Sequence, residues 1–82
     1  MRIPRDKSGE ELTRILGRKY GYQITRQSGS HIKLTTLLKG EHHITIPKHR
    51  FLKIGTLNSI LGDIAKYLET DKENVIEELF GK

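Results

Sequence analysis

The chain contains no cysteine among its 82 residues. A disulfide framework and a thiolate metal site are therefore both excluded. No apolar run approaches the roughly 20 residues of a membrane-spanning helix, and nothing at the start resembles a secretion signal. Internal repeats, low-complexity segments and domain linkers are also missing. These absences predict a single domain, 1–82, that lies in the cytoplasm and uses neither a membrane nor a small-molecule cofactor.

Positive charge is unevenly distributed along the chain, whose formal net charge is +5. Residues 1–66 hold 13 Lys and Arg against 5 Asp and Glu, whereas residues 67–82 hold 2 against 5. The body is therefore basic and the C-terminal part is acidic. A basic surface concentrates polyanions, of which nucleic acid is the usual one, although many small basic proteins bind none.

A helix is predicted over 8–20, after a basic lead-in at 1–7. Ser8 and Glu11 have the spacing of a capping box, in which each side chain bonds to the backbone of the other residue. Gly21 favours the end of the helix. The apolar positions recur at helical spacing and are Leu12, Ile15, Leu16 and Tyr20.

A three-stranded antiparallel sheet is predicted over 22–47. Residues 28–30, Ser-Gly-Ser, are typical of a three-residue turn, which would place Gln27 opposite His31. A second three-residue turn, with Gly40 in a left-handed conformation, would place Leu34 opposite Ile46. One face of the sheet is then apolar and includes Ile24 and Leu38. The polar face is expected to show Gln23, Thr25, Gln27, His31, Lys33, Thr35, Leu37, His43 and Thr45.

Two helices are predicted in 56–80. Pro47 ends the last strand, because it cannot donate to the sheet. Thr56 is expected to cap the first helix, and Thr70 to Glu73 form a second capping-box pattern before the last one. The predicted fold is a two-layer α+β domain, with the double-stranded-RNA-binding-like α-β-β-β-α order and an extra short C-terminal helix.

His31 is the residue with the clearest chemical potential. An imidazole, which ordinarily titrates near pH 6.5, can take a proton from a ribose 2′-hydroxyl or give one to a leaving 5′-oxygen. Cleavage of RNA in this way needs no metal, because the substrate supplies the nucleophile. Lys33, two residues along the same strand face, is placed to stabilise the phosphate charge. The alternative is an exposed strand histidine without a catalytic task.

The other histidines leave several possibilities open. His43, on the predicted polar face, can approach the region of His31, and either His43 or His49 could be a second acid or base. His42 is expected to be structural, and His49 could instead contact phosphate. No carboxylate accompanies the histidines at a recognisable ligand spacing, so no metal site is expected. Free amide groups after Lys53, where a helix begins, can attract phosphate.

Several motifs occur together in a fixed order. They are Arg26-Gln27-Ser28-Gly29-Ser30-His31, then Thr45-Ile46-Pro47 with Lys48-His49, and finally Gly55-Thr56-Leu57-Asn58-Ser59-Ile60-Leu61. With this combination the chain resembles, over about residues 8–80, the HicA (YcfA-like) family of mRNA interferase toxins. The chain departs from that pattern at Ile54, where family members often have proline.

The resemblance implies a metal-independent endoribonuclease that cleaves mRNA. It would be the toxin of a type II toxin–antitoxin pair with a role in stress response, with His31 as catalytic residue and a HicB-type antitoxin as partner. The residues expected to bind RNA or phosphate are Arg26, Gly29, Ser30, Lys33, Lys48, His49 and Lys53. Two alternatives stay open: a non-catalytic RNA-binding module of the same fold, and a protein-interaction domain that uses the acidic last helix.

Overall fold

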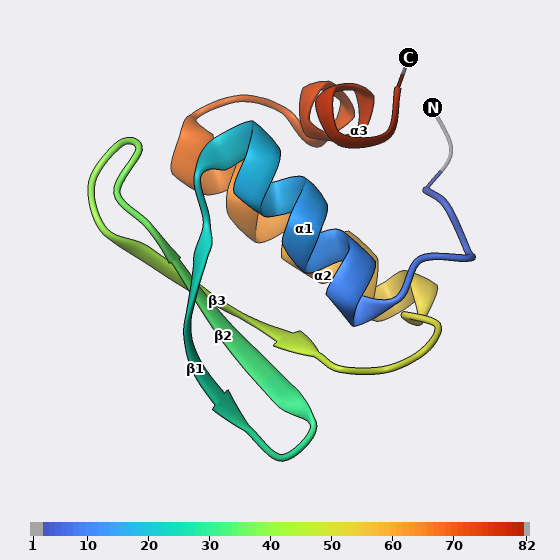
Figure 1. Cartoon of the computed structure of the whole chain (residues 1–82). Helices are drawn as coiled ribbons and strands as arrows, with labels where there is room; N and C mark the ends of the chain where they lie inside the picture. The colour runs from blue at the N-terminus through green and yellow to red at the C-terminus, as the bar shows by residue number, and fades with distance from the viewer. Residues whose placement is uncertain (1–2, 82) are drawn as a thin grey trace.

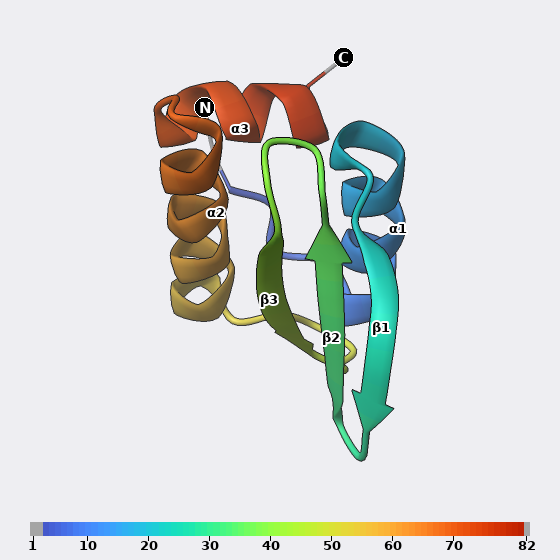
Figure 2. The ribbon, with the colours of Figure 1, turned by 90° about the vertical axis from the view of Figure 1, so that its left-hand side faces the viewer.

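Three helices and three strands make up the computed structural model, which describes residues 3–81. Arg2 of the basic lead-in lies outside the described residues. The strands form one antiparallel sheet in the order β1-β2-β3. Figures 1 and 2 show α1 and α2 over one face of this sheet, with α3 crossing the end of both helices. The predicted α+β fold with an extra C-terminal helix is confirmed. The elements are α1 (Gly9–Tyr20), β1 (Gln23–Ser28), β2 (His31–Thr36), β3 (His42–Pro47), α2 (Ile54–Leu68) and α3 (Lys72–Phe80).

The hydrophobic core lies between the sheet and the helices. Apolar side chains on one face of β2 and β3 meet the apolar stripes of α1 and α2, and α3 closes one end. Full burial of one such side chain stabilises the fold by about 1.5–3 kcal/mol. The fully buried members are Leu12, Leu16, Leu34, Ile46, Leu57, Leu61, Ile64, Val75 and Ile76.

Helix α1 begins and ends as the sequence predicts. The Ser8 hydroxyl accepts a hydrogen bond from the Glu11 amide at 3.0 Å, and the Glu11 carboxylate accepts one from the Ser8 amide at 2.9 Å. This capping box satisfies two amide groups that have no partner within the helix. Gly21 ends the helix in the left-handed region, with φ of 73°. Both predictions for this helix are confirmed.

The starts of α2 and α3 differ from the predictions. Helix α2 begins at Ile54, with Lys53 in the N-cap position and no side-chain cap, so Thr56 lies in its first turn. Half-buried Ile54 extends the apolar stripe of α2 backwards, which explains the earlier start. In α3 the N-cap is Asp71, whose carboxylate accepts from the Asn74 amide at 3.0 Å. Thr70 instead accepts from the Asn74 side chain at 2.9 Å, so the predicted capping box is wrong.

The β1–β2 hairpin has a tighter turn than predicted. Ser28 pairs with His31, so only Gly29 and Ser30 form the connection. Gly29 has φ of 58°, and a glycine with positive φ at the first position suits a two-residue hairpin turn. In this register Gln27 lies opposite Ile32, on the helix side of the sheet. The prediction of Gln27 on the polar face is therefore wrong.

A β-bulge between Ile24 and Arg26 compensates for the short turn. The extra residue, Thr25, allows Arg26 to pair with Lys33 and Ile24 to pair with Leu34. Arg26 therefore shares the face of Lys33. Ile24 faces the helices but remains 49% exposed, because β1 is an edge strand.

The β2–β3 connection is longer than predicted and spans residues 37–41, since Thr36 pairs with His42 and Leu34 with Ile44. The strand residues face the predicted sides of the sheet, but the register differs from the predicted one by two residues. The Tyr67 hydroxyl holds the longer connection by donating to the Gly40 carbonyl at 2.7 Å. Leu38 is 58% exposed in this loop, so its predicted place on the apolar face is wrong. Gly40 has φ of 97°, which confirms the predicted positive angle.

Candidate functional site

The sheet face that the helices leave uncovered, here called the open face, carries the strongest candidate residues. Opposed residues of antiparallel strands lie on the same face, so the pairing identifies its members. Most of the predicted members are confirmed, but Arg26 replaces Gln27, and Leu37 lies in the connection between β2 and β3. The open face consists of Gln23, Thr25, Arg26 and Ser28 from β1, His31, Lys33 and Thr35 from β2, and His43 and Thr45 from β3.

His31 is the first residue of β2 and lies next to the hairpin turn. It is paired with Ser28 on one side and with Pro47 on the other. The Lys48 amide donates to the Ser30 carbonyl at 2.6 Å, which fixes this corner of the sheet. The His31 ring is exposed, and no hydrogen bond joins it to another residue in 3–81. The backbone is therefore held while both ring nitrogens are open to a ligand.

Two cations lie beside His31 on the open face. Lys33 is two residues further along β2, a rise of about 7 Å, and Arg26 is its cross-strand neighbour on β1. Both side chains are exposed, and neither has an ion pair with a carboxylate in the described part of the chain. The β-bulge produces this pairing of Arg26 with Lys33. Together they can neutralise a phosphate group beside the imidazole.

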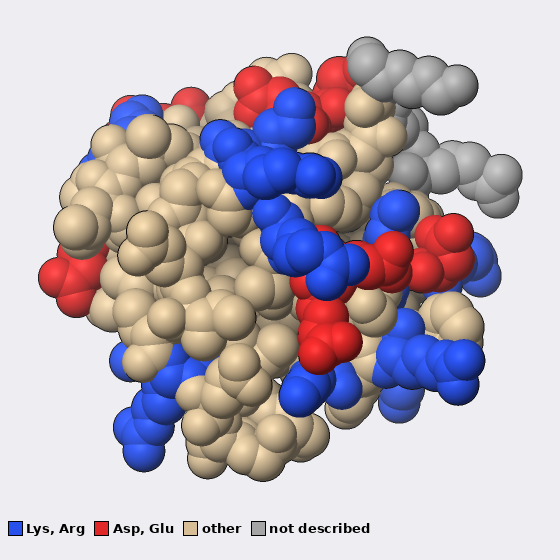
Figure 3. All heavy atoms as spheres, viewed as in Figure 1, with Lys and Arg blue, Asp and Glu red and all other residues tan. Residues whose placement is uncertain are grey.

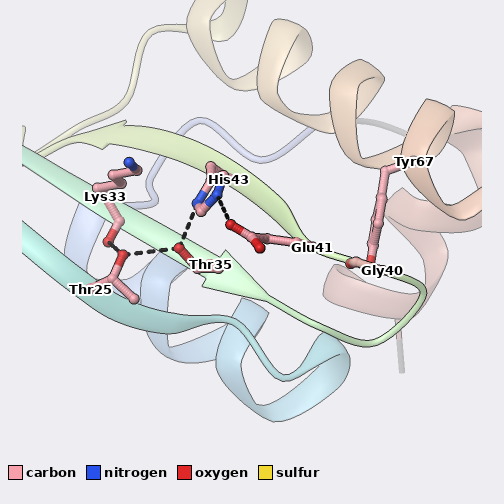
Figure 4. Close-up of polar contacts among 7 residues, drawn as sticks. All are labelled: Thr25, Lys33, Thr35, Gly40, Glu41, His43 and Tyr67. Atoms are coloured by element: carbon pink, nitrogen blue, oxygen red, sulfur yellow. Dashed lines mark hydrogen bonds and ion pairs between the residues drawn. The ribbon is translucent and has the colours of Figure 1, made fainter.

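His43 belongs to a hydrogen-bonded row across the open face, which Figure 4 shows. Its Nε2 lies 2.7 Å from a carboxylate oxygen of Glu41, and its Nδ1 lies 2.7 Å from the Thr35 hydroxyl. Thr35 is in turn 2.9 Å from the Thr25 hydroxyl, which donates to the Lys33 carbonyl at 3.4 Å. These partners occupy both ring nitrogens of His43.

The position of His43 corrects the expectation that it works beside His31. His43 is paired with Thr35, four residues along β2 from His31. That separation is about 13 Å along the strand, which is too far for both imidazoles to act on one phosphodiester. The two histidines therefore lie at opposite ends of the open face.

His42 has a structural environment, as predicted. Its Nδ1 lies 2.8 Å from the Tyr22 hydroxyl, and its ring stacks on Tyr67 with the ring centroids 4.3 Å apart. Its Nε2 is 3.6 Å from a carboxylate oxygen of Asp63. Burial raises the pKa of the neighbouring Tyr22 hydroxyl well above its ordinary value. His42 thus ties β3 to α2 and does not reach the open face.

Carboxylates do accompany two histidines, contrary to the expectation. Glu41 and His43 are two residues apart, a spacing that puts both on one side of an extended chain, and this signal was available in the sequence. Asp63 reaches His42 from another element, which spacing along the chain does not reveal. No group of three metal-ligating side chains occurs within 3–81.

The remaining predicted residues lie away from the open face. The Lys48 ammonium is 3.8 Å from a carboxylate oxygen of Glu10, and its side chain lines a cleft beside α1. His49 and Lys53 are exposed in the segment between β3 and α2. We call residues 48–53 the basic loop. Gly29 and Ser30 form the turn that leads into His31.

Sequence reasoning missed one exposed aromatic residue. Phe51, in the middle of the basic loop, is 60% exposed. An aromatic residue among basic ones is a recognised pattern for nucleic-acid contacts and was visible in the sequence. Positive charge also extends beyond the open face. Figure 3 shows Lys and Arg side chains gathered over α1, whose exposed cations are Arg14, Arg18 and Lys19.

Comparison with known families gives a match over most of the chain. The family model described as "HicA toxin of bacterial toxin-antitoxin" matches residues 9–66. The chain belongs to the HicA toxin family. No curated protein and no solved structure gave a match. The HicA match includes α1, the whole sheet and most of α2, whereas α3 lies beyond it. None of the helices in the described part of this HicA chain is long and apolar enough to cross a membrane.

Proposed function

We propose that this HicA-family chain is an endoribonuclease that cleaves mRNA without a metal ion and uses His31 for proton transfer. The observation that carries the proposal is the exposed imidazole of His31 on a rigid sheet corner, with Lys33 and Arg26 beside it. Membership of a toxin family supports a toxic activity of this kind. The reaction takes place in the cytoplasm, where mRNA is available.

The chemistry needs one nucleophile, and the RNA provides it. The 2′-hydroxyl oxygen attacks the adjacent phosphorus while its proton passes to the His31 imidazole. The bond from phosphorus to the 5′-oxygen breaks, which leaves a 2′,3′-cyclic phosphate and a 5′-hydroxyl. That 5′-oxygen takes a proton, either from the imidazolium or from water. Such acid–base catalysis contributes about 10²- to 10⁴-fold to a rate.

The cations stabilise charge that grows during the reaction. The phosphorane-like transition state concentrates negative charge on the non-bridging oxygens. Lys33 and Arg26, on the same sheet face as His31, are the cations available to bind those oxygens. A fixed cation favours the transition state over the ground state because the charge is greater there. His43 is excluded from the acid–base step by its distance and by its engaged nitrogens.

Membership of a toxin–antitoxin family implies a regulating partner. An antitoxin of the HicB type would inhibit the enzyme by covering the open face, because His31, Lys33 and Arg26 are all exposed there. Acidic side chains on the partner would complement the two cations. Covering this face would block access of RNA without altering the fold of the toxin.

Cleavage of single-stranded RNA in the presence of EDTA tests the mechanism. The wild-type protein should cut, and His31→Ala should cut about 10²- to 10⁴-fold more slowly while it still binds RNA. His43→Ala is the matched control, since it makes the same chemical change on the same face and should retain most of the activity. The products should carry cyclic phosphate ends.

Equal cleavage by wild type and His31→Ala would refute the role of His31. A wild-type protein that binds RNA with steep salt dependence but never cuts it would favour the non-catalytic RNA-binding module instead. A loss of activity on addition of EDTA would contradict metal independence.

A further inference from the structure

We propose that Phe51, on the basic loop after the strand that pairs with His31, is a stacking platform for an unpaired base of the RNA substrate. This inference rests on the proposed function, because it assigns the basic loop to the same substrate. It also defines the substrate class as single-stranded RNA, since a base can lie on an aromatic ring only when it is unpaired.

The surroundings of Phe51 distinguish it from an ordinary exposed apolar residue. Phe80 packs against the hydrophobic core, whereas Phe51 is 60% exposed and makes no contribution to that core. Its neighbour Leu52 is only 3% exposed. The loop therefore buries Leu52 and presents the aromatic ring of Phe51 to solvent.

Backbone hydrogen bonds hold the basic loop on both sides of Phe51. The Gly9 amide donates to the His49 carbonyl at 2.9 Å, and the Leu52 amide donates to the Lys7 carbonyl at 2.9 Å. At the start of the loop, the Lys48 amide is bonded to Ser30 in the hairpin turn. A loop fixed in this way loses little conformational entropy when it binds a ligand.

Positively charged residues flank Phe51 in the chain. Arg50 precedes it and Lys53 follows it by two residues, and both are exposed and without an ion pair in the described chain. Cationic side chains that track a phosphate backbone, together with an aromatic ring for the base, form the usual arrangement for single-stranded nucleic acid. The combination favours RNA over an apolar protein surface.

The basic loop starts beside His31 and then runs on the helix side of the sheet, as Figure 2 shows. His31 is paired with Pro47 in the sheet, and Cα atoms of such a pair are about 5 Å apart. Phe51 is four positions after Pro47 in the chain, so the two Cα atoms are at most about 14 Å apart. One RNA strand can therefore meet His31 with a phosphate and reach Phe51 with a base several nucleotides further along.

The chain's lack of tryptophan makes a direct test possible. In a His31→Ala background, which keeps the RNA intact, F51W introduces a single indole at the proposed platform. We expect its fluorescence to be quenched when a single-stranded oligoribonucleotide is titrated in. The control is L37W at Leu37, which is 73% exposed in the β2–β3 connection and should show little quenching.

Affinity provides the second measurement. In the same background, F51A should weaken binding of the labelled single strand by about 5- to 150-fold, the range for loss of one base–aromatic stack. The fold-loss of RNA affinity should be the same at each salt concentration, because F51A removes no phosphate contact. Binding of inorganic polyphosphate should not change, since it has no bases.

Several outcomes would overturn the proposal. One is unchanged RNA affinity of F51A, and another is an equal loss of affinity for polyphosphate. Quenching of L37W as strong as that of F51W would do the same. So would an F51A variant that loses affinity for a protein partner but not for RNA. If the wild type cleaves RNA but F51A binds RNA as well as its parent does, stacking is refuted and the ribonuclease proposal stands. Quenching of F51W without any wild-type cleavage would support stacking and refute the ribonuclease.

Discussion

Replacement of Gly9 by alanine should destabilise the fold strongly. Gly9 is buried at the first position of α1, where the helix approaches the end of β3. A Cβ atom there would lie 2.0 Å from the Pro47 carbonyl oxygen and 3.3 Å from Cγ2 of Ile46. The backbone of Pro47 must therefore move, and the bond from the Gly9 amide to His49 must lengthen.

The expected cost combines these two effects. Overpacking costs about 1–3 kcal/mol, and a weakened hydrogen bond adds about 0.5–1.5 kcal/mol. The free energy of unfolding should therefore fall by about 2–4 kcal/mol. At roughly 4–8 °C per kcal/mol for a domain of this size, the midpoint of thermal unfolding should fall by about 10–30 °C.

Gly62→Ala is the matched control, because it makes the same chemical change in a place with free space. Gly62 lies inside α2, and a Cβ atom there would meet nothing within 4 Å. Alanine is about 0.5–1 kcal/mol better than glycine inside a helix, so this variant should be more stable than wild type. Urea unfolding of the three proteins measures both effects. If Gly9→Ala were as stable as wild type, the close approach of α1 to β3 would be wrong.

Two further predictions concern stability. Burial raises the pKa of Tyr22 above its ordinary value, so its stabilising contribution is complete below pH 10 and is lost as the pH rises further. Unfolding at alkaline pH should show a loss of up to about 1.4 kcal/mol per pH unit from this group, and Tyr22→Phe should remove that part of the slope. The part due to Tyr20, whose pKa burial and a hydrogen bond to Glu78 also raise, should remain. Ser8→Ala should cost about 1 kcal/mol in urea unfolding through loss of the capping box, whereas an unchanged midpoint would contradict that cap.

The periodic features of the chain were predictable because they follow from burial. The apolar stripes of α1 and α2 and the alternation of β2 appear directly in the sequence, and the structure buries the residues expected, including Leu12, Leu34 and Leu61. The capping box at Ser8 was equally readable. Local patterns of this kind depend on few residues and leave little room for another arrangement.

The pairing of the strands was not predictable from the same patterns. Arg26 and Gln27 are both polar, so the sequence does not indicate which of them faces the helices, and the bulge at Thr25 decides it. In the β2–β3 connection, both registers keep the apolar residues on one face. A contact from Tyr67, 27 residues away from Gly40, selects the longer loop. Tertiary contacts of this kind have no local signature.

The candidate site was predictable in part for the same reason. His31 lies on the open face in either register, because strand alternation alone determines its side. The pairing of Arg26 with Lys33 depends on the bulge, and the bonding of Glu41 to His43 depends on how the loop turns. Residues placed by alternation were therefore found, whereas those placed by irregular backbone were not.

The bulge at Thr25 has a consequence for the behaviour of the chain in concentrated solution. In a three-stranded sheet both outer strands are edges, and an unpaired edge is a template for strand addition and aggregation. The bulge interrupts the regular edge of β1, and Arg26 adds a charge beside it. On the other outer strand, Pro47 removes the last amide donor. The irregularity that brings Arg26 beside Lys33 therefore also protects the sheet from pairing with other copies of itself.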